Sequence, residues 1–127
     1  MKSAKLILIV MFIAGTALAQ TGTIRRTVLQ KTDVSVPGRE AVVARVELDA
    51  GVAAGRHSHP GDEISYVLEG EGELLIDGED PRRVKAGESF VIPAGTVHDA
   101  VNTGKSTMKL VGVYVVEKGK PLASAAK

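Results

Sequence analysis

Short apolar runs separated by glycine and proline turns occupy most of the chain, and this pattern restricts the fold more than any other feature. The clearest run, 41–48, places every second residue from Val42 to Leu48 on one apolar face of an extended strand. Asp77-Gly78 lies between apolar runs and predicts a tight hairpin. Further strands are expected at 23–30, 64–68, 74–76, 89–92, 97–102 and 108–116. No segment after Ala19 keeps a helical period over ten residues, so the sequence predicts an all-β sandwich or small closed barrel.

The N-terminus has the layout of a secretory signal peptide spanning 1–19. Lys2 and Lys5 supply a charged start, an unbroken apolar run follows, and Ala17-Leu18-Ala19 matches a small-x-small cleavage site. Cleavage before Gln20 predicts a protein that is periplasmic or secreted. The alternatives are a buried N-terminal helix and an uncleaved membrane anchor. The 13 residues from 6 to 18 are fewer than the roughly 20 that a membrane-spanning helix requires.

Composition limits both the partners and the chemistry. The 127 residues suit one domain with one core. Removal of Lys2 and Lys5 takes the 16 basic residues to 14, against 15 acidic ones, so the processed chain is nearly neutral. This balance predicts no nucleic-acid partner and, after signal cleavage, no membrane partner. The chain contains no cysteine, so a metal can be held only by nitrogen and oxygen ligands.

Three potential metal ligands occur close together in the sequence. His57 and His59 are two residues apart, so they point to the same side of an extended strand. Pro60-Gly61 is typical of a tight turn that folds the chain back and brings Glu63 beside the two imidazoles. Two neutral nitrogens and one carboxylate suit a first-row divalent metal. A fourth ligand has to come from elsewhere, and the only other histidine is His98.

Two sequence motifs resemble those of the cupin family. Gly51-x5-His57-x-His59-x3-Glu63-x6-Gly70 is similar to the first cupin motif, and Gly87-x5-Pro93-x-Gly95-x2-His98-x3-Asn102 is similar to the second. The spacer 71–86 is short, as in small single-domain bacterial cupins of the quercetin dioxygenase-like type. The resemblance implies a double-stranded β-helix (jelly-roll) barrel, with a metal held by His57, His59, Glu63 and His98. It also implies a homodimer, with an N-terminal strand region at 20–40, the barrel at 41–118 and a C-terminal tail at 119–127.

The other polar residues near the motifs have structural interpretations. Strand alternation directs Arg56 and Asp99 away from the ligand side, and Asp62 belongs to the turn. Asn102 is expected to stabilise an Asn-Thr-Gly turn, and the motif glycines are expected to supply turn geometry. Alternation leaves the position of Tyr66 open, either in the pocket or outside it. The sequence therefore indicates four ligands and no separate acid, base or nucleophile.

A site of three histidines and one glutamate leaves coordination positions open on one divalent transition metal, which is Fe, Mn, Ni, Cu or Zn. The retained Glu63 departs from thiol dioxygenases within the family and resembles quercetinase-type dioxygenases, germin-like oxidases and oxalate-active cupins. That resemblance implies a metal-dependent oxygenase acting on a small phenolic or oxyacid substrate, with Glu63 as a general base as well as a ligand. The alternative is a non-catalytic exported module that binds a metal or small ligand.

Overall fold

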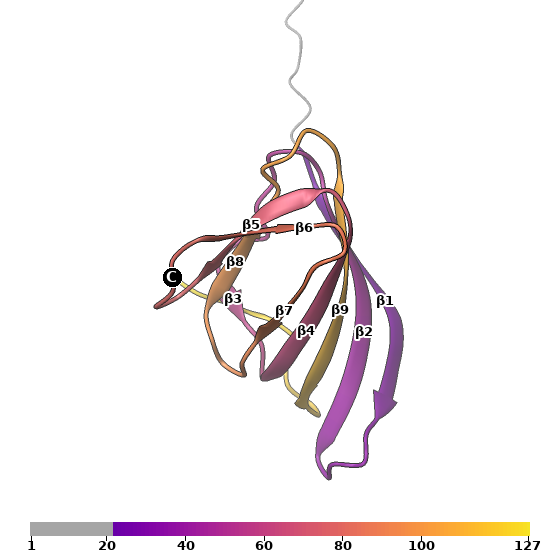
Figure 1. Ribbon diagram of the computed structural model, residues 1–127. Coiled ribbons are helices and arrows are strands. Elements are labelled where there is room, and N and C mark those ends of the chain that lie inside the picture. Colours follow the sequence, from indigo (N-terminus) through magenta and orange to yellow (C-terminus); the bar gives the residue numbers. More distant parts are fainter. Residues whose placement is uncertain (1–21) are drawn as a thin grey trace, which may run out of the picture.

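The computed structural model describes residues 22–127, and all of the regular elements in this part of the chain are strands (Figure 1). They are β1 (Ile24–Asp33), β2 (Arg39–Leu48), β3 (His57–Ser58), β4 (Gly61–Glu69), β5 (Glu71–Ile76), β6 (Arg82–Lys85), β7 (Ser89–Ile92), β8 (His98–Val101), β9 (Met108–Glu117) and β10 (Ser124–Ala125). Among these residues there is no helix that could cross a membrane. The predicted signal peptide at 1–19 lies outside the described residues.

The strands form two five-stranded antiparallel sheets that face each other (Figure 1). The first sheet has the order β1-β2-β9-β4-β7, and the second has the order β10-β3-β8-β5-β6. From β3 onward the chain passes repeatedly between the sheets, so neighbouring strands come from distant parts of the sequence. This arrangement confirms the all-β prediction and the double-stranded β-helix.

The core lies between the two sheets and is built by strand alternation. Along β2 the inward residues Val42, Ala44, Val46 and Leu48 are all buried, as their pattern predicted. Strand β9 alternates in the same way over its whole length. The other large buried side chains include Phe90 and Met108, and the rest are mostly aliphatic, namely Val67, Leu74, Ile76, Val84, Ile92, Leu110 and Val116. Burying each large one contributes about 1.5–3 kcal/mol, so this core is a large source of stability that does not involve the metal ligands.

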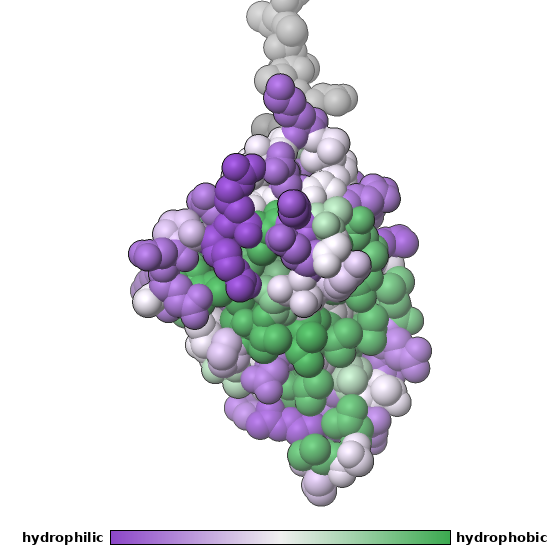
Figure 2. All heavy atoms as spheres, in the orientation of Figure 1, coloured by the Kyte–Doolittle hydropathy of each residue, from purple (hydrophilic) through white to green (hydrophobic). Residues whose placement is uncertain are grey.

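Tyr66 lies on the outer face of the first sheet rather than in the pocket. Its exposed fraction is 49%, and Ile64 and Leu68 on the same strand, with Val91 on β7, are also exposed. Figure 2 shows hydrophobic residues gathered over the middle of the visible face, across β7, β4 and β9. The alternation that buries Val67 necessarily turns Tyr66 outward.

The interpretation of Pro60-Gly61 as a tight turn is wrong. Gly61 is the first residue of β4 and is not among the glycines with positive φ, whereas Gly51, Gly70, Gly87 and Gly95 are, as expected of turn glycines. A Cβ at Gly61 would collide with the carbonyl oxygen of Val115 on β9. Glycine is therefore required because two backbones approach closely where the chain crosses from β3 to β4.

Candidate metal centre

The fold brings together all four predicted site residues. His57 on β3 and His98 on β8 are direct partners in the second sheet, and Glu63 projects from β4 in the first sheet. His59 lies in the crossing between β3 and β4. One ligand atom from each residue lies within 4.8 Å of every other, and all but His57 are fully buried. Pairing of β3 with β8 places His98 against His57, some forty positions earlier in the chain, and the packing of the two sheets adds Glu63.

Backbone carbonyl oxygens orient all three imidazole rings. Nδ1 of His57 lies 2.6 Å from the Gly55 oxygen, Nδ1 of His59 lies 2.7 Å from the Leu122 oxygen, and Nδ1 of His98 lies 2.9 Å from the Thr96 oxygen. A carbonyl only accepts hydrogen bonds, so each Nδ1 carries the proton and donates it. In the neutral ring each Nε2 therefore presents a lone pair, which is the atom a metal requires.

Glu63 is held with one oxygen toward the imidazoles. The Ser65 hydroxyl donates to Oε1 at 2.7 Å, while Oε2 lies 3.0 Å from His98 Nε2 and 3.1 Å from His59 Nε2. Burial opposes ionisation, but the contacts with His59, His98 and Ser65 outweigh it and hold the pKa of Glu63 well below its ordinary value. Glu63 is thus an oriented carboxylate at neutral pH.

The donor set fits a divalent cation. His59 Nε2 is buried without a hydrogen-bond partner, because its approach to Glu63 is close but poorly aligned. A lone pair on Nε2 facing a carboxylate oxygen at 3.0 or 3.1 Å is repulsive unless a proton or a cation lies between them. Ligands on opposite sides of a first-row ion at about 2.1 Å lie about 4.2 Å apart. The observed spread of 4.8 Å closes to that value with small movements.

The environment shifts the pKa values of His57 and His98 in opposite directions. Burial lowers the pKa of His57, and the neighbouring imidazoles His98 and His59 add to this effect. Burial also acts against a charged His98, but its contacts with Glu63 and the Thr96 carbonyl outweigh burial and raise the pKa of His98. Without a cation, His98 is therefore the first of these two rings to take up a proton.

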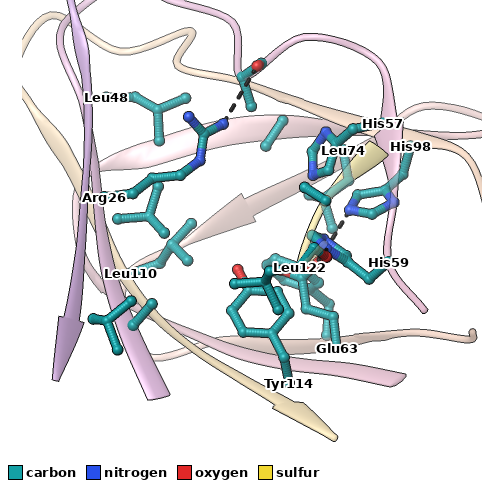
Figure 3. A pocket seen from close by; sticks show the side chains of 17 residues that line it. Arg26, Leu48, His57, His59, Glu63, Leu74, His98, Leu110, Tyr114 and Leu122 are labelled. Carbon is teal, nitrogen blue, oxygen red and sulfur yellow. Dashed lines mark hydrogen bonds and ion pairs between the residues drawn. The ribbon is translucent and has the colours of Figure 1, made fainter. Parts of the chain in front are cut away.

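The cluster lies at one side of a cavity between the sheets (Figure 3). The cavity offers about 80 Å³ to the centres of water-sized molecules, which is room for several waters or one small organic molecule. Apart from the cluster, the lining is mostly aliphatic and includes Leu48, Leu74, Leu110 and Leu122. The polar exceptions are Arg26 and Tyr114.

Tyr114 on β9 places a phenol beside the cluster. Its ring centroid lies 4.7 Å from that of His59, and its side chain is buried. Burial, together with the Glu63 charge, raises the pKa of Tyr114 above its ordinary value, so the hydroxyl stays protonated. Tyr114 lies outside both sequence motifs, so sequence reasoning gave it no chemical role.

The end of the chain also contributes to the site. Strand β10 pairs with β3, and the carbonyl of Leu122, just before β10, accepts the hydrogen bond from His59. Leu122 also lines the cavity. Sequence reasoning missed this contribution, since a backbone carbonyl leaves no signature in the sequence.

The remaining polar residues near the motifs lie outside the cavity. Arg56 pairs with Asp77 at 2.9 Å, and Asp62 accepts a hydrogen bond from the Ala94 backbone. Asn102 is fully buried, donates to the carbonyls of Leu48 and Ser106, and accepts from Gly104, which confirms its structural role.

Asp99 requires one correction. It points away from the cavity lining, as predicted, but it is buried rather than exposed. Its carboxylate accepts a hydrogen bond from the Gly55 backbone at 2.9 Å, so it fixes the loop before β3. The carbonyl of Gly55 in turn orients His57.

Comparisons with known proteins agree with this geometry. An oxalate-binding protein of Thermotoga maritima is 35% identical over 74 residues, which cover 58% of this chain and 60% of that protein. An uncharacterised double-stranded β-helix protein of Klebsiella pneumoniae superposes with a TM-score of 0.66 at 27% identity, covering 82% and 85% of the two chains. Oxalate oxidase in complex with glycolate superposes with a TM-score of 0.63 at 29% identity, covering 80% of this chain and 54% of that one. The chain spans between 33% and 60% of the length of the curated relatives that it matches.

Residues 44–116 match the family described as Cupin domain, which is more than half of the chain. The matched segment runs from the middle of β2 to near the end of β9 and contains all four residues of the cluster. This chain therefore belongs to the cupin family.

Proposed function

We propose that this protein is an exported metal-dependent oxygenase or oxidase that acts on a small oxyacid. One divalent transition metal, Fe, Mn, Ni, Cu or Zn, is held by His57, His59, Glu63 and His98. The observation that carries the proposal is the placement of this donor set at the side of a small, mostly aliphatic cavity. A buried site that has oriented ligands and adjoining space is the usual arrangement for binding a small molecule at a metal.

The size of the cavity favours a small oxyacid over a larger phenol. A volume of about 80 Å³ open to the centres of water-sized molecules suits a small oxyacid, whereas a flavonol would have to extend beyond the cavity. An oxyacid also matches the charge of the site, because three neutral imidazoles and one carboxylate leave a divalent cation with a net positive charge.

Glu63 of the donor set and the neighbouring Tyr114 divide the proton chemistry. When bound, the metal supplies a Lewis acid and, for a redox-active ion, electron exchange with dioxygen. Glu63 is the only carboxylate among the residues that line the cavity, so it is the group that can accept a proton from the substrate. Tyr114 keeps its proton at neutral pH and is therefore the hydrogen-bond donor. Ser65 keeps the Glu63 carboxylate oriented.

Similarity to an oxalate-binding protein and to an oxalate oxidase supports an oxyacid ligand. The first of these also supports the second candidate function, a non-catalytic module that binds a metal and a small ligand. Dioxygen consumption separates the two candidates.

We also propose that the protein is exported and forms a homodimer. The signal-peptide pattern at 1–19 supports a periplasmic or secreted protein. Leu29 is more than half exposed and β1 is an edge strand, which together support a homodimer formed through the N-terminal strand.

The experiment compares the wild type with Glu63→Gln, each loaded separately with Fe, Mn, Ni or Cu. Dioxygen uptake is measured with oxalate, glycolate, catechol and a flavonol, and bound metal is measured by mass spectrometry. Glu63→Gln removes the charge and keeps an oxygen donor, so we expect it to retain appreciable metal and lose most turnover.

Glu40→Gln is the matched control, because Glu40 is also a buried glutamate but pairs with Lys31 and does not line the cavity. Turnover that persists undiminished in Glu63→Gln refutes the role of Glu63. Oxyacid binding without turnover by any metal form favours the binding module.

A further inference from the structure

Arg26 is the one cationic side chain among the residues lining the cavity that is charged at every physiological pH. On β1 it pairs with Val46 of β2, and this register turns its side chain toward the space between the sheets. Figure 3 shows the guanidinium on the opposite side of the cavity from the cluster. The guanidinium donates a 3.4 Å hydrogen bond to the Ala54 carbonyl.

Most of the hydrogen-bonding capacity of Arg26 is unused within the described residues. A guanidinium has five N–H donors, and one long bond to Ala54 occupies one of them. None of the ion pairs found among residues 22–127 includes Arg26, although the adjacent Arg25 pairs with both Glu47 and Asp49. Arg26 is solvent-exposed, so water occupies these donors in the free protein, and a carboxylate that enters the cavity can take its place.

Charge balance indicates how many negative charges the ligand carries. A divalent ion, the Glu63 carboxylate and the Arg26 guanidinium give the lining a formal charge of about +2. The charge of Arg26 also acts across the cavity. Burial and the Glu63 charge raise the pKa of Tyr114, and the Arg26 charge opposes that rise. A ligand with two negative groups neutralises the formal charge of the lining, whereas a ligand with one negative group leaves the lining with a net positive charge.

We propose that the cavity selects a small dicarboxylate, with one carboxylate at the four-ligand cluster and the other paired with Arg26. This inference rests on the proposed function, since it assigns the class of oxyacid for the same site. Arg26 is thus the specificity-determining residue of the pocket, and Tyr114 donates a hydrogen bond between the two ends.

The test measures binding, independently of turnover. Zinc-loaded wild type, Arg26→Gln and Arg26→Lys are titrated calorimetrically with oxalate, malonate and succinate, and with acetate and propionate as matched monoanions. We expect the wild type to prefer at least one dianion over the monoanions, and Arg26→Gln to lose about tenfold in affinity for that dianion. The expected loss is not larger because Arg26 is solvent-exposed. Arg26→Lys keeps the charge without the planar fork, so its affinity is expected to be intermediate.

Arg25→Gln is the matched control, because Arg25 adjoins Arg26 on β1 but pairs with outward acids and does not line the cavity. Dianion affinity that falls equally in Arg25→Gln and Arg26→Gln reflects general surface charge and overturns the assignment. Equal affinity of wild type and Arg26→Gln for every dianion also overturns it, as does a wild type without a dianion preference. Zinc content, measured on each sample, separates these results from failure of the proposed function, in which the wild type itself holds no metal.

Discussion

Gly112 controls the position of Tyr114, and replacing it with alanine is the most informative single change outside the metal ligands. Gly112 lies within β9, two residues before Tyr114, and its φ is not in the positive range. The backbone therefore tolerates alanine, and any penalty must come from the new methyl group. An added Cβ would lie 2.7 Å from the Tyr114 hydroxyl oxygen and 2.8 Å from two ring carbons.

The loss of stability expected for Gly112→Ala follows from these distances. Ordinary contact begins at 3.4 Å, so the phenol has to retreat by about 0.7 Å. Its ring is packed against His59, which limits that movement. Overpacking of this kind costs about 1–3 kcal/mol, and the reduced entropy of the unfolded chain returns about 0.4–1 kcal/mol. We expect Gly112→Ala to lower the free energy of unfolding by about 1–2 kcal/mol and the melting temperature by roughly 5–10 °C.

Urea unfolding followed by circular dichroism measures the effect in two backgrounds, wild type and Tyr114→Ala. In the second background the methyl group meets no phenol, so Gly112→Ala should be neutral or stabilising. The difference between the two values is the coupling energy of the pair, which we expect to exceed about 1 kcal/mol. An identical effect in both backgrounds refutes the argument that Gly112 exists to accommodate Tyr114.

Further outcomes are expected for metal binding, pH dependence, stability and the C-terminus. His98→Ala should reduce bound divalent metal sharply, and wild-type metal affinity should fall as the pH drops through about 6.5, since only neutral imidazole ligates. Because the pKa of His98 is raised and that of His57 is lowered, proton competition should begin at His98 on the alkaline side of that value and reach His57 last. Equal metal loading of His98→Ala and wild type at every pH contradicts the site. When the metal is in hundredfold excess over its Kd, removing it with a chelator should lower the free energy of unfolding by about 2.7 kcal/mol. The far-ultraviolet circular dichroism should stay unchanged. Loss of that signal would mean that the barrel needs the metal in order to fold. Deleting residues 120–127 should weaken metal affinity about tenfold, because the Leu122 carbonyl that orients His59 is removed, whereas deleting Lys127 alone should not.

The sequence by itself determined the class of fold and the four residues of the cluster. Turn glycines and strand alternation are local properties, so they predicted β2, β7 and β9 nearly to the residue. The spacing of His57, His59 and Glu63 is also local, and His98 was reached because the chain has no other histidine and its surroundings match a family motif. Local spacing misled at Gly61, where the reason for glycine is a strand more than fifty residues away, and it did not reveal that Asp99 is buried.

Only the tertiary structure decided what surrounds the cluster. Arg26, Tyr114 and Leu122 come from the two ends of the described chain and meet across the barrel, because both sheets join strands that are distant in sequence. Strand alternation along residues 24–28 puts Arg26 on the same face as two apolar residues. This pattern could have identified Arg26 as facing inward. It could not have placed Arg26 across the cavity from the metal ligands. The burial of Asp99 likewise depends on the loop that folds over it. The lining of a cavity is a property of how the sheets close, and that closure is encoded in contacts between strands rather than in any one stretch of sequence.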